Sequence, residues 1–346
     1  MFVSLCLFLM FGEANAADYP MNVIDSAGRE VTIDAPIEMI VVLNSDAAEA
    51  ASILGSTDKI MGVTDSVEKY KAYYFSNQLD DWIVVGTWKE FNYEKIADLA
   101  KDESGRIEPG MLVISYTSKV SEVDENLSPF RNIAVVGFDF YKADTMEDEI
   151  TTLGVILDRE EKADAYENWF QEKKDDVVSA ISGLDKFKVY VEGSSTGGLG
   201  SLGTYAEGSS LNDMIQLAGG DNVIEGLTGT PKVDWETILA LNPDVIIKVP
   251  PGINQLGWSD ASEMEEMVDE IKSRPGANDI SAVQDNKVYV IFRDMTLGAG
   301  NVVGLTYWAK MLHPEIDLDP VSVYEEYLNI RGLDYPCEKL FVYPEI

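Results

Sequence analysis

Segments of continuous apolar residues alternate along the chain with segments in which apolar residues recur at helical spacing. Residues 233–249, VDWETILALNPDVIIKV, show this most clearly. Asp234 is a good helix N-cap, and Asn242-Pro243 ends the helix that follows it. The β-branched run 245–247 is typical of a strand that is covered on both faces. The segment therefore predicts a helix that leads into a buried strand.

The same helix–strand pattern occurs earlier in the chain, at residues 92–114, where Asn92 takes the place of Asp234. The earlier copy differs by an extra polar segment, Lys101–Glu108. A second pair of similar segments lies upstream of the two copies: Ile53–Val63 and Gln216–Leu227. Two related units in one chain predict two similar lobes.

Strands that alternate with helices predict an α/β fold with mostly parallel sheets. Residues 145–184 differ, because they carry helical spacing and no strand pattern. Asp158 is predicted to cap a long helix within this segment, running to about Ser182. We therefore expect an N-terminal lobe at 17–144, a helical linker at 145–184 and a C-terminal lobe at 185–346.

The first residues predict a secretory signal at 1–16. Phe2–Phe11 is an apolar stretch, and Ala14-Asn15-Ala16 has the small residues of a cleavage site. A buried strand is the alternative, because no Lys or Arg precedes Arg29. With the signal removed, Cys337 is the remaining cysteine, so no internal disulfide is expected, and the protein should be secreted or otherwise extracytoplasmic.

Acidic residues outnumber basic ones by 61 to 26, which gives a net charge of −35. A nucleic-acid partner is excluded on this ground, since phosphate binding needs basic patches. The acidity fits adaptation to salt or a solvated surface, and a few carboxylates could instead dock a basic partner. One histidine, His313, leaves no possibility of a three-histidine zinc site.

Two glycine motifs follow a predicted strand in the second half of the chain. Gly193–Gly197 fits the G-x-S-x-G pattern of a nucleophilic serine, which would pair Ser195 with His313 in a secreted serine hydrolase. Residues 198–203 fit G-x-G-x-x-G, but no helix opens there as a dinucleotide site requires. A loop that lets a ligand approach the backbone is the better interpretation of both motifs.

In open α/β sheets, ligands bind outside the carboxyl ends of the strands. Residues at these ends combine aromatic rings, hydroxyl groups and one cation, which suits a bulky ligand that is partly apolar and partly anionic. Core packing is the alternative for each aromatic ring, and a salt bridge with Asp294 is the alternative for the cation. The predicted ligand-binding residues are Asn44, Ser45, Trp88, Tyr116, Thr117, Tyr141, Ser194, Ser195, Tyr205, Trp258 and Arg293.

The sequence resembles the cobalamin/iron–siderophore class of extracytoplasmic substrate-binding proteins of ABC importers, from about residue 23 to residue 314. The pieces that carry the resemblance include MIVVLNSDAAEAASILGSTDKIMGV, WKEFNYEKIADL, SSLNDMIQLAGGDNVIEGL, VDWETILALNPDVII and NKVYVI. The resemblance implies two Rossmann-like α/β lobes joined by a single long helix, here Arg159–Ser182. It also implies a ligand held between the lobes, with Tyr116 at a ligand-facing strand end, and no catalysis.

The resemblance further implies one glutamate on each lobe that docks onto the permease of the importer. Glu122 matches the first position, and Glu263 or Glu265 matches the second. The partners would be a permease–ATPase complex and a small metal chelate, and the protein would be a monomer, peripheral to the membrane, without a cofactor of its own. Solvated helix charge is the alternative for the glutamates.

The identity of the ligand is left open by the sequence. A ferric siderophore, a corrinoid, haem and a metal oxyanion such as molybdate are all candidates. A serine hydrolase that uses Ser195 and a surface adhesion module are rival functions from other classes.

Overall fold

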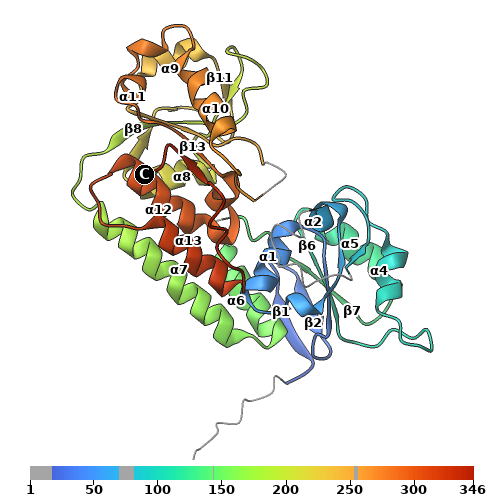
Figure 1. Ribbon diagram of the computed structural model, residues 1–346. Helices are drawn as coiled ribbons and strands as arrows, with labels where there is room; N and C mark the ends of the chain where they lie inside the picture. Colours follow the sequence, from blue (N-terminus) through green and yellow to red (C-terminus); the bar gives the residue numbers. More distant parts are fainter. Residues whose placement is uncertain (1–17, 70–81, 143, 253–255) are drawn as a thin grey trace, which may run out of the picture.

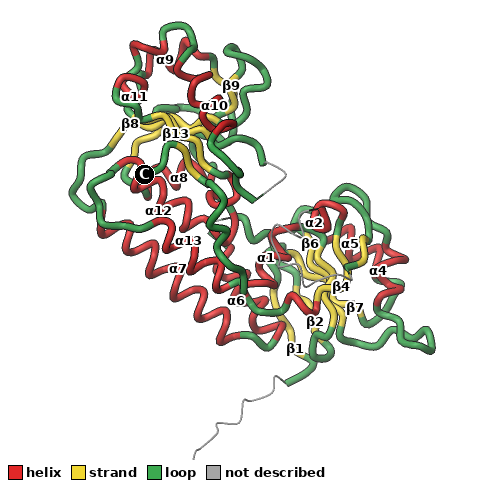
Figure 2. The backbone as a smooth tube through the Cα atoms, viewed as in Figure 1, coloured by secondary structure: helices red, strands yellow, loops and turns green. Residues whose placement is uncertain are grey.

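The computed structural model describes residues 18–69, 82–142, 144–252 and 256–346. These residues form two α/β lobes with a layer of helices running between them (Figures 1 and 2). The predicted signal segment 1–16 lies outside the described residues. The α/β class, the two lobes and the mostly parallel sheets predicted from the sequence are confirmed.

The N-terminal lobe is built on a five-stranded parallel sheet in the order β5-β4-β3-β6-β7. An antiparallel hairpin, β1 (Met21–Ile24) and β2 (Glu30–Ile33), precedes it. The sheet strands are β3 (Met39–Val42), β4 (Ile60–Val63), β5 (Ile83–Val84), β6 (Met111–Ser115) and β7 (Ile133–Gly137). The described helices of this lobe are α1 (Ser45–Ile53), η1 (Thr57–Lys59), α2 (Asp65–Lys69), α4 (Tyr93–Leu99) and α5 (Val120–Leu127).

The C-terminal lobe has a second five-stranded sheet in the order β10-β8-β12-β13-β14, in which only β14 is antiparallel. Its strands are β8 (Phe187–Glu192), β10 (Gly220–Asn222), β12 (Val245–Lys248), β13 (Val288–Ile291) and β14 (Val342–Tyr343), and β9 (Leu202–Gly203) pairs separately with β11 (Lys232–Val233). The helices are α8 (Ser210–Leu217), α9 (Trp235–Leu241), α10 (Ser262–Lys272), η2 (Ala277–Asp279), α11 (Ser281–Gln284), η3 (Arg293–Thr296), η4 (Gly298–Gly300), α12 (Asn301–Leu312) and α13 (Pro320–Ile330).

The repeated helix–strand unit has the same construction in both lobes. In α4, the Asn92 side chain accepts a hydrogen bond from the backbone N–H of Lys95, and in α9 Asp234 accepts one from Thr237. The strands that follow, β6 and β12, each pair with the first sheet strand of their own lobe, β3 and β8. The extra segment 101–108 forms an exposed loop closed by a bridge between Lys101 and Ile107. The insertion therefore leaves the repeated unit intact.

Two helices join the lobes, α6 (Met146–Leu157) and the 21-residue α7 (Glu160–Ala180). The prediction that Asp158 caps α7 is wrong. Asp158 ends α6 instead, in a left-handed conformation with φ of 57°, and Arg159 stands at the N-cap of α7 without a side-chain cap. One cluster of buried apolar side chains continues from the N-terminal lobe through these helices into the C-terminal lobe, so the lobes share a core.

The last helix of the chain also reaches the N-terminal lobe. Figure 1 shows α13 lying beside α7 with one end near α1. There the Tyr327 hydroxyl donates to Glu49 of α1 over 2.6 Å, and Nη1 of Arg331 lies 3.2 Å from the same carboxylate. Nε of Arg331 donates to Ser52 over 3.0 Å. The helical linker is therefore not the only connection that fixes one lobe against the other.

Replacing Arg331 by Met should cost about 3 kcal/mol of unfolding free energy, because it leaves a buried carboxylate without its cation. Urea denaturation measures the loss, and adding Glu49→Gln should recover part of it. Lys186→Met, in the exposed pair with Asp221, is the matched control and should cost at most about 1 kcal/mol. Equal losses in the two single variants would contradict a structural role for the buried pair.

Candidate functional site

A cavity of about 340 Å³ lies where the two lobes meet. Its lining comes from α1, from the ends of β6 and β7, and from the segment after β13. Four of the residues predicted from the sequence line it, namely Ser45, Tyr116, Tyr141 and Arg293, and the others are Asp46, Glu49, Asp294 and Leu297. Both lobes therefore contribute to a single site.

The topology of the N-terminal sheet explains why the cavity lies there. The chain passes from β3 to β4 on one side and later to β6 on the other, so the loops after β3 and β6 diverge. Such a switch point leaves a crevice at the carboxyl ends of the strands. Asn44 follows β3 and caps α1 by accepting a hydrogen bond from Ala47 over 2.7 Å. The cap places Ser45 and Asp46 in the first turn of α1, at the edge of this crevice.

Asp46 and Tyr116 face each other across the switch point. The Tyr116 hydroxyl donates to Oδ2 of Asp46 over 2.5 Å. Burial raises the pKa of Asp46 to about 7, and the carboxylates of Glu49 and Asp294 add to this rise while the Tyr116 hydrogen bond opposes it. Burial and the Asp46 charge also raise the pKa of Tyr116, which keeps its hydroxyl protonated as a donor.

Glu49 lies one turn further along α1 and separates the cavity from α13. Burial raises its pKa, and the charge of Arg331 and the hydrogen bond from Tyr327 oppose that rise. Gly298 closes the same side, with a backbone φ of +65°. A Cβ atom there would lie 3.3 Å from Oε2 of Glu49 and 3.7 Å from Oδ1 of Asp46. Glycine thus allows the segment after β13 to pass close to both carboxylates.

Tyr141 completes the aromatic side of the cavity. Its ring packs edge-to-face against Tyr116, with the ring centres 5.7 Å apart. The preceding residue, Phe140, is buried with a positive φ of 54°, and its backbone N–H donates to Glu149. Thr117 does not line the cavity, because its hydroxyl and N–H both bind Asp139. Its role is to hold the chain after β6 against the chain after β7.

The two predicted tryptophans lie outside the cavity. Trp258 is 1% exposed, packs against Phe292 and donates its indole N–H to Glu263 over 3.1 Å. Trp88 is 57% exposed, with the Lys89 ammonium 5.2 Å from its ring centre. Core packing thus accounts for Trp258, and neither tryptophan lines the cavity between the lobes.

Tyr205 lies nearer the cavity without lining it. Burial raises its pKa, and the charge of Arg293 opposes this rise, which places the two side chains within electrostatic range. Its ring covers Gly193, where a Cβ atom would lie 3.1 Å from the Tyr205 hydroxyl. The glycine therefore lets Tyr205 pack onto the end of β8.

Ser194 and Ser195 do not form a hydrolase site with the single histidine. The Ser194 hydroxyl bonds that of Thr196, and Ser195 accepts from the Lys248 ammonium over 3.3 Å. Lys248 also donates to the buried Glu192, so it offers Ser195 no proton acceptor. His313 packs against Phe187, at the opposite end of β8, roughly 16 Å away by the rise of a strand.

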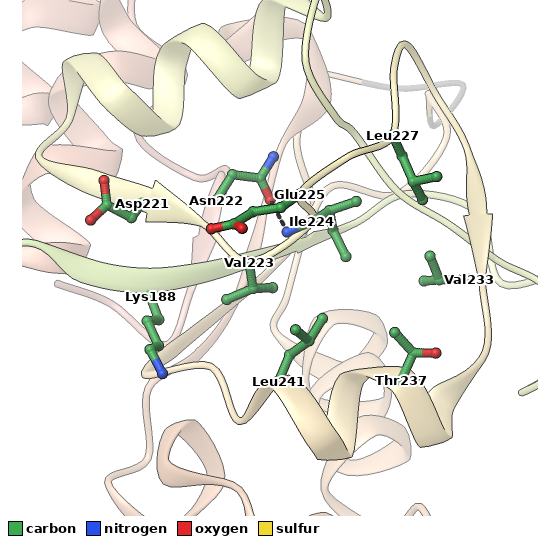
Figure 3. Close-up of a pocket in the computed structure, with 10 residues that line it drawn as sticks. All are labelled: Lys188, Asp221, Asn222, Val223, Ile224, Glu225, Leu227, Val233, Thr237 and Leu241. Atoms are coloured by element: carbon green, nitrogen blue, oxygen red, sulfur yellow. Dashed lines mark hydrogen bonds between the residues drawn. The ribbon is translucent and has the colours of Figure 1, made fainter.

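A second cavity, of about 430 Å³, lies wholly within the C-terminal lobe (Figure 3). It lies between α9 and the chain that follows β10. Its sides are mostly apolar, from Val223, Ile224, Leu227, Val233 and Leu241, with Lys188, Asp221 and Glu225 among its polar residues. None of the residues predicted to bind a ligand lines it.

The three predicted docking glutamates lie on the helices that follow the repeated units. Glu122, on α5, accepts a hydrogen bond from the Tyr93 hydroxyl over 3.2 Å. Glu263 and Glu265 both lie in the first turn of α10, and Glu263 accepts from Trp258. All three residues are exposed, so the geometry leaves them accessible to a partner.

Among the described residues, no three His, Cys, Asp or Glu side chains are arranged to hold a metal ion. Within that same part of the chain, no helix is both long and apolar enough to cross a membrane. The arrangement is that of a two-lobed α/β protein in which strand ends from both lobes line one cavity.

The comparison with known families agrees with this class. The family described as "Periplasmic binding protein" matches residues 40–294. The chain belongs to the periplasmic binding protein family.

Relatives and solved structures show the same similarity over most of the chain. An uncharacterized ABC transporter substrate-binding lipoprotein of Bacillus subtilis, YvrC, is 22% identical, covering 86% of this chain and 87% of that protein. The high-affinity heme uptake system protein IsdE of Staphylococcus aureus is 26% identical, over 60% of this chain and 72% of that protein.

Two solved structures share the fold. The TroA-like periplasmic binding protein FepB of Veillonella parvula superposes with a TM-score of 0.74 at 20% identity, covering 93% of this chain and 99% of that one. The molybdate-bound MolA of Haemophilus influenzae gives 0.68 at 21% identity, over 91% and 99% of the two chains.

Asp46→Asn should change how stability depends on pH in the ligand-free protein. Because the pKa of Asp46 is raised from 3.8 to about 7, its contribution to stability is complete at low pH and is lost as pH rises through 7. Asn imitates the protonated acid and can still accept from Tyr116. The variant should therefore melt a few degrees above the parent at pH 8 and match it near pH 4.

Thermal melts from pH 4 to 8 measure this difference. Asp102→Asn is the control, because hydrogen bonds lower the pKa of that exposed acid, and its replacement should give no gain at pH 8. If Asp46→Asn lowered the melting temperature at pH 8, Asp46 would not be a destabilised carboxylate.

Proposed function

We propose that this protein captures a metal chelate in the cavity between its lobes and delivers it to an ABC importer outside the cytoplasm. The chelate would be a ferric siderophore, a corrinoid or haem. The observation that carries the proposal is the convergence of strand ends from both lobes on one cavity, walled on one side by Tyr116 and Tyr141. Relatives named as substrate-binding and heme-uptake proteins support it.

A metal oxyanion such as molybdate is the second candidate, because MolA, which shares the fold, is a molybdate-binding protein. The charges of the cavity speak against it. Of the eight lining residues, three are carboxylic acids and one is an arginine. A small dianion would lose its hydration to enter a site where negative charge predominates.

Haem could take a tyrosinate as its iron ligand, but Tyr116 is poorly suited to this role. Its hydroxyl already donates to Asp46, and the raised pKa opposes the ionised form that would bind iron. Tyr141 is the more accessible tyrosine, since the residue is 43% exposed, although burial raises the pKa of its hydroxyl as well. Haem would therefore be held mainly by stacking, with Tyr141 as the available oxygen ligand.

Thermal melts with ferric siderophores, cobinamide, cobalamin, haem and molybdate test the proposed class of ligand. A bound chelate at 100 times its dissociation constant should add about 2.7 kcal/mol of stability. Tyr141→Ala should remove this gain, while Trp88→Ala, outside the cavity, should keep it. The proposal would be contradicted if no chelate raised the stability. It would also be contradicted if Trp88→Ala removed the gain in stability while Tyr141→Ala kept it.

For delivery, we propose that Glu122 on α5 is one permease-docking residue and that Glu263 or Glu265 is the other. Glu122→Arg should abolish uptake by cells that express the matching importer, because it reverses a charge at the docking surface. Binding of the chelate should stay unchanged, since α5 does not line the cavity. Glu161→Arg on the exposed side of α7 is the control and should support normal uptake.

A further inference from the structure

The charges in the interlobe cavity are unevenly distributed. Asp46, Glu49 and Asp294 lie close enough to one another that the second and third raise the pKa of the first. Arg331, which does not line the cavity, compensates Glu49 at 3.2 Å. Among the described residues, no lysine or arginine forms an ion pair with Asp46, whereas Glu49 has one with Arg331. The partner of Asp46 is the neutral hydroxyl of Tyr116.

The cation of the cavity, Arg293, lies toward another part of the C-terminal lobe. Its Nη1 would be 3.8 Å from a Cβ atom on Gly252, and its charge acts on Tyr205. The cavity therefore has an acidic side at α1 and a basic side toward the ends of β8 and β12. A ligand that spans it meets charges of opposite sign at its two ends.

The aromatic rings provide an observation that is independent of the acids. Tyr116 and Tyr141 line the same cavity as Asp46, at right angles to each other. Aromatic faces attract ammonium groups, and they do so most strongly where water is excluded. Two aromatic rings beside a carboxylate that has no cation as its partner are suited to binding an organic cation.

We propose that the ligand carries a protonated amine that binds at Asp46, beside the tyrosine pair, while its oxygen-rich face meets Arg293. The inference rests on the function proposed above and narrows it. The preferred chelates have a free amine, and chelates with uniform negative charge are excluded by the acids of α1. Asp46 is then the residue that determines specificity.

A matched pair of probes tests this assignment: ferrioxamine B, a ferric hydroxamate chelate with a free primary amine, and the same chelate with that amine acetylated. Calorimetry with the full protein should show the amine form binding about tenfold more tightly. Asp46→Asn, which can still accept from Tyr116, should remove most of that preference. Glu161→Gln on α7, outside the cavity, should leave it unchanged.

The outcomes separate this inference from the function on which it rests. If both probes bound equally, or if Asp46→Asn kept the preference, recognition of the amine at Asp46 would be wrong while capture of a chelate would stand. If neither probe bound and the screen with the other chelates also gave no gain, both proposals would fall. Circular dichroism of each variant would show that it is folded.

Discussion

The carboxylate of Glu49 is the group on which the arrangement of the lobes depends. It belongs to the first helix of the N-terminal lobe, yet its hydrogen bond and its cation, from Tyr327 and Arg331, both come from the end of the chain. A buried carboxylate without such partners would be costly, so α1 and α13 must stay together. Because the first turn of α1 also carries Ser45 and Asp46, this one contact fixes the acidic side of the cavity.

The rest of the site follows from the duplicated topology. Each lobe places a capped helix before an inner strand, α4 before β6 and α9 before β12, and each inner strand pairs with the first sheet strand of its lobe. A crevice at the carboxyl ends of the strands results in both lobes. The shared core through α7 and α12 holds the two crevices in a nearly constant relation. We therefore expect only a small closing motion when a ligand binds.

The sequence predicted the elements whose signals are local. The caps Asn92 and Asp234 and the buried strands after them are set by neighbouring residues, so they could be predicted. Asp158 could not be placed, because an acidic residue can serve either end of a helix. The rule that ligands bind outside the carboxyl ends of the strands identified Ser45, Tyr116, Tyr141 and Arg293. It missed Asp46 and Glu49, whose side chains project from α1 and reach the cavity through tertiary packing. Trp258 fulfils the same rule and is nevertheless buried against Phe292.

The place of α13 in the chain has a consequence for how the protein is made. Arg331 follows Glu49 by 282 residues. At about 5–20 residues per second, roughly 15–55 s separate the synthesis of the acid from that of its cation. Throughout this interval Glu49 lacks its cation, and α1 is not yet held against α13. The contact between α1 and α13 therefore forms only after the end of α13 has been synthesised, a delay that the order of the residues imposes on the acidic side of the cavity.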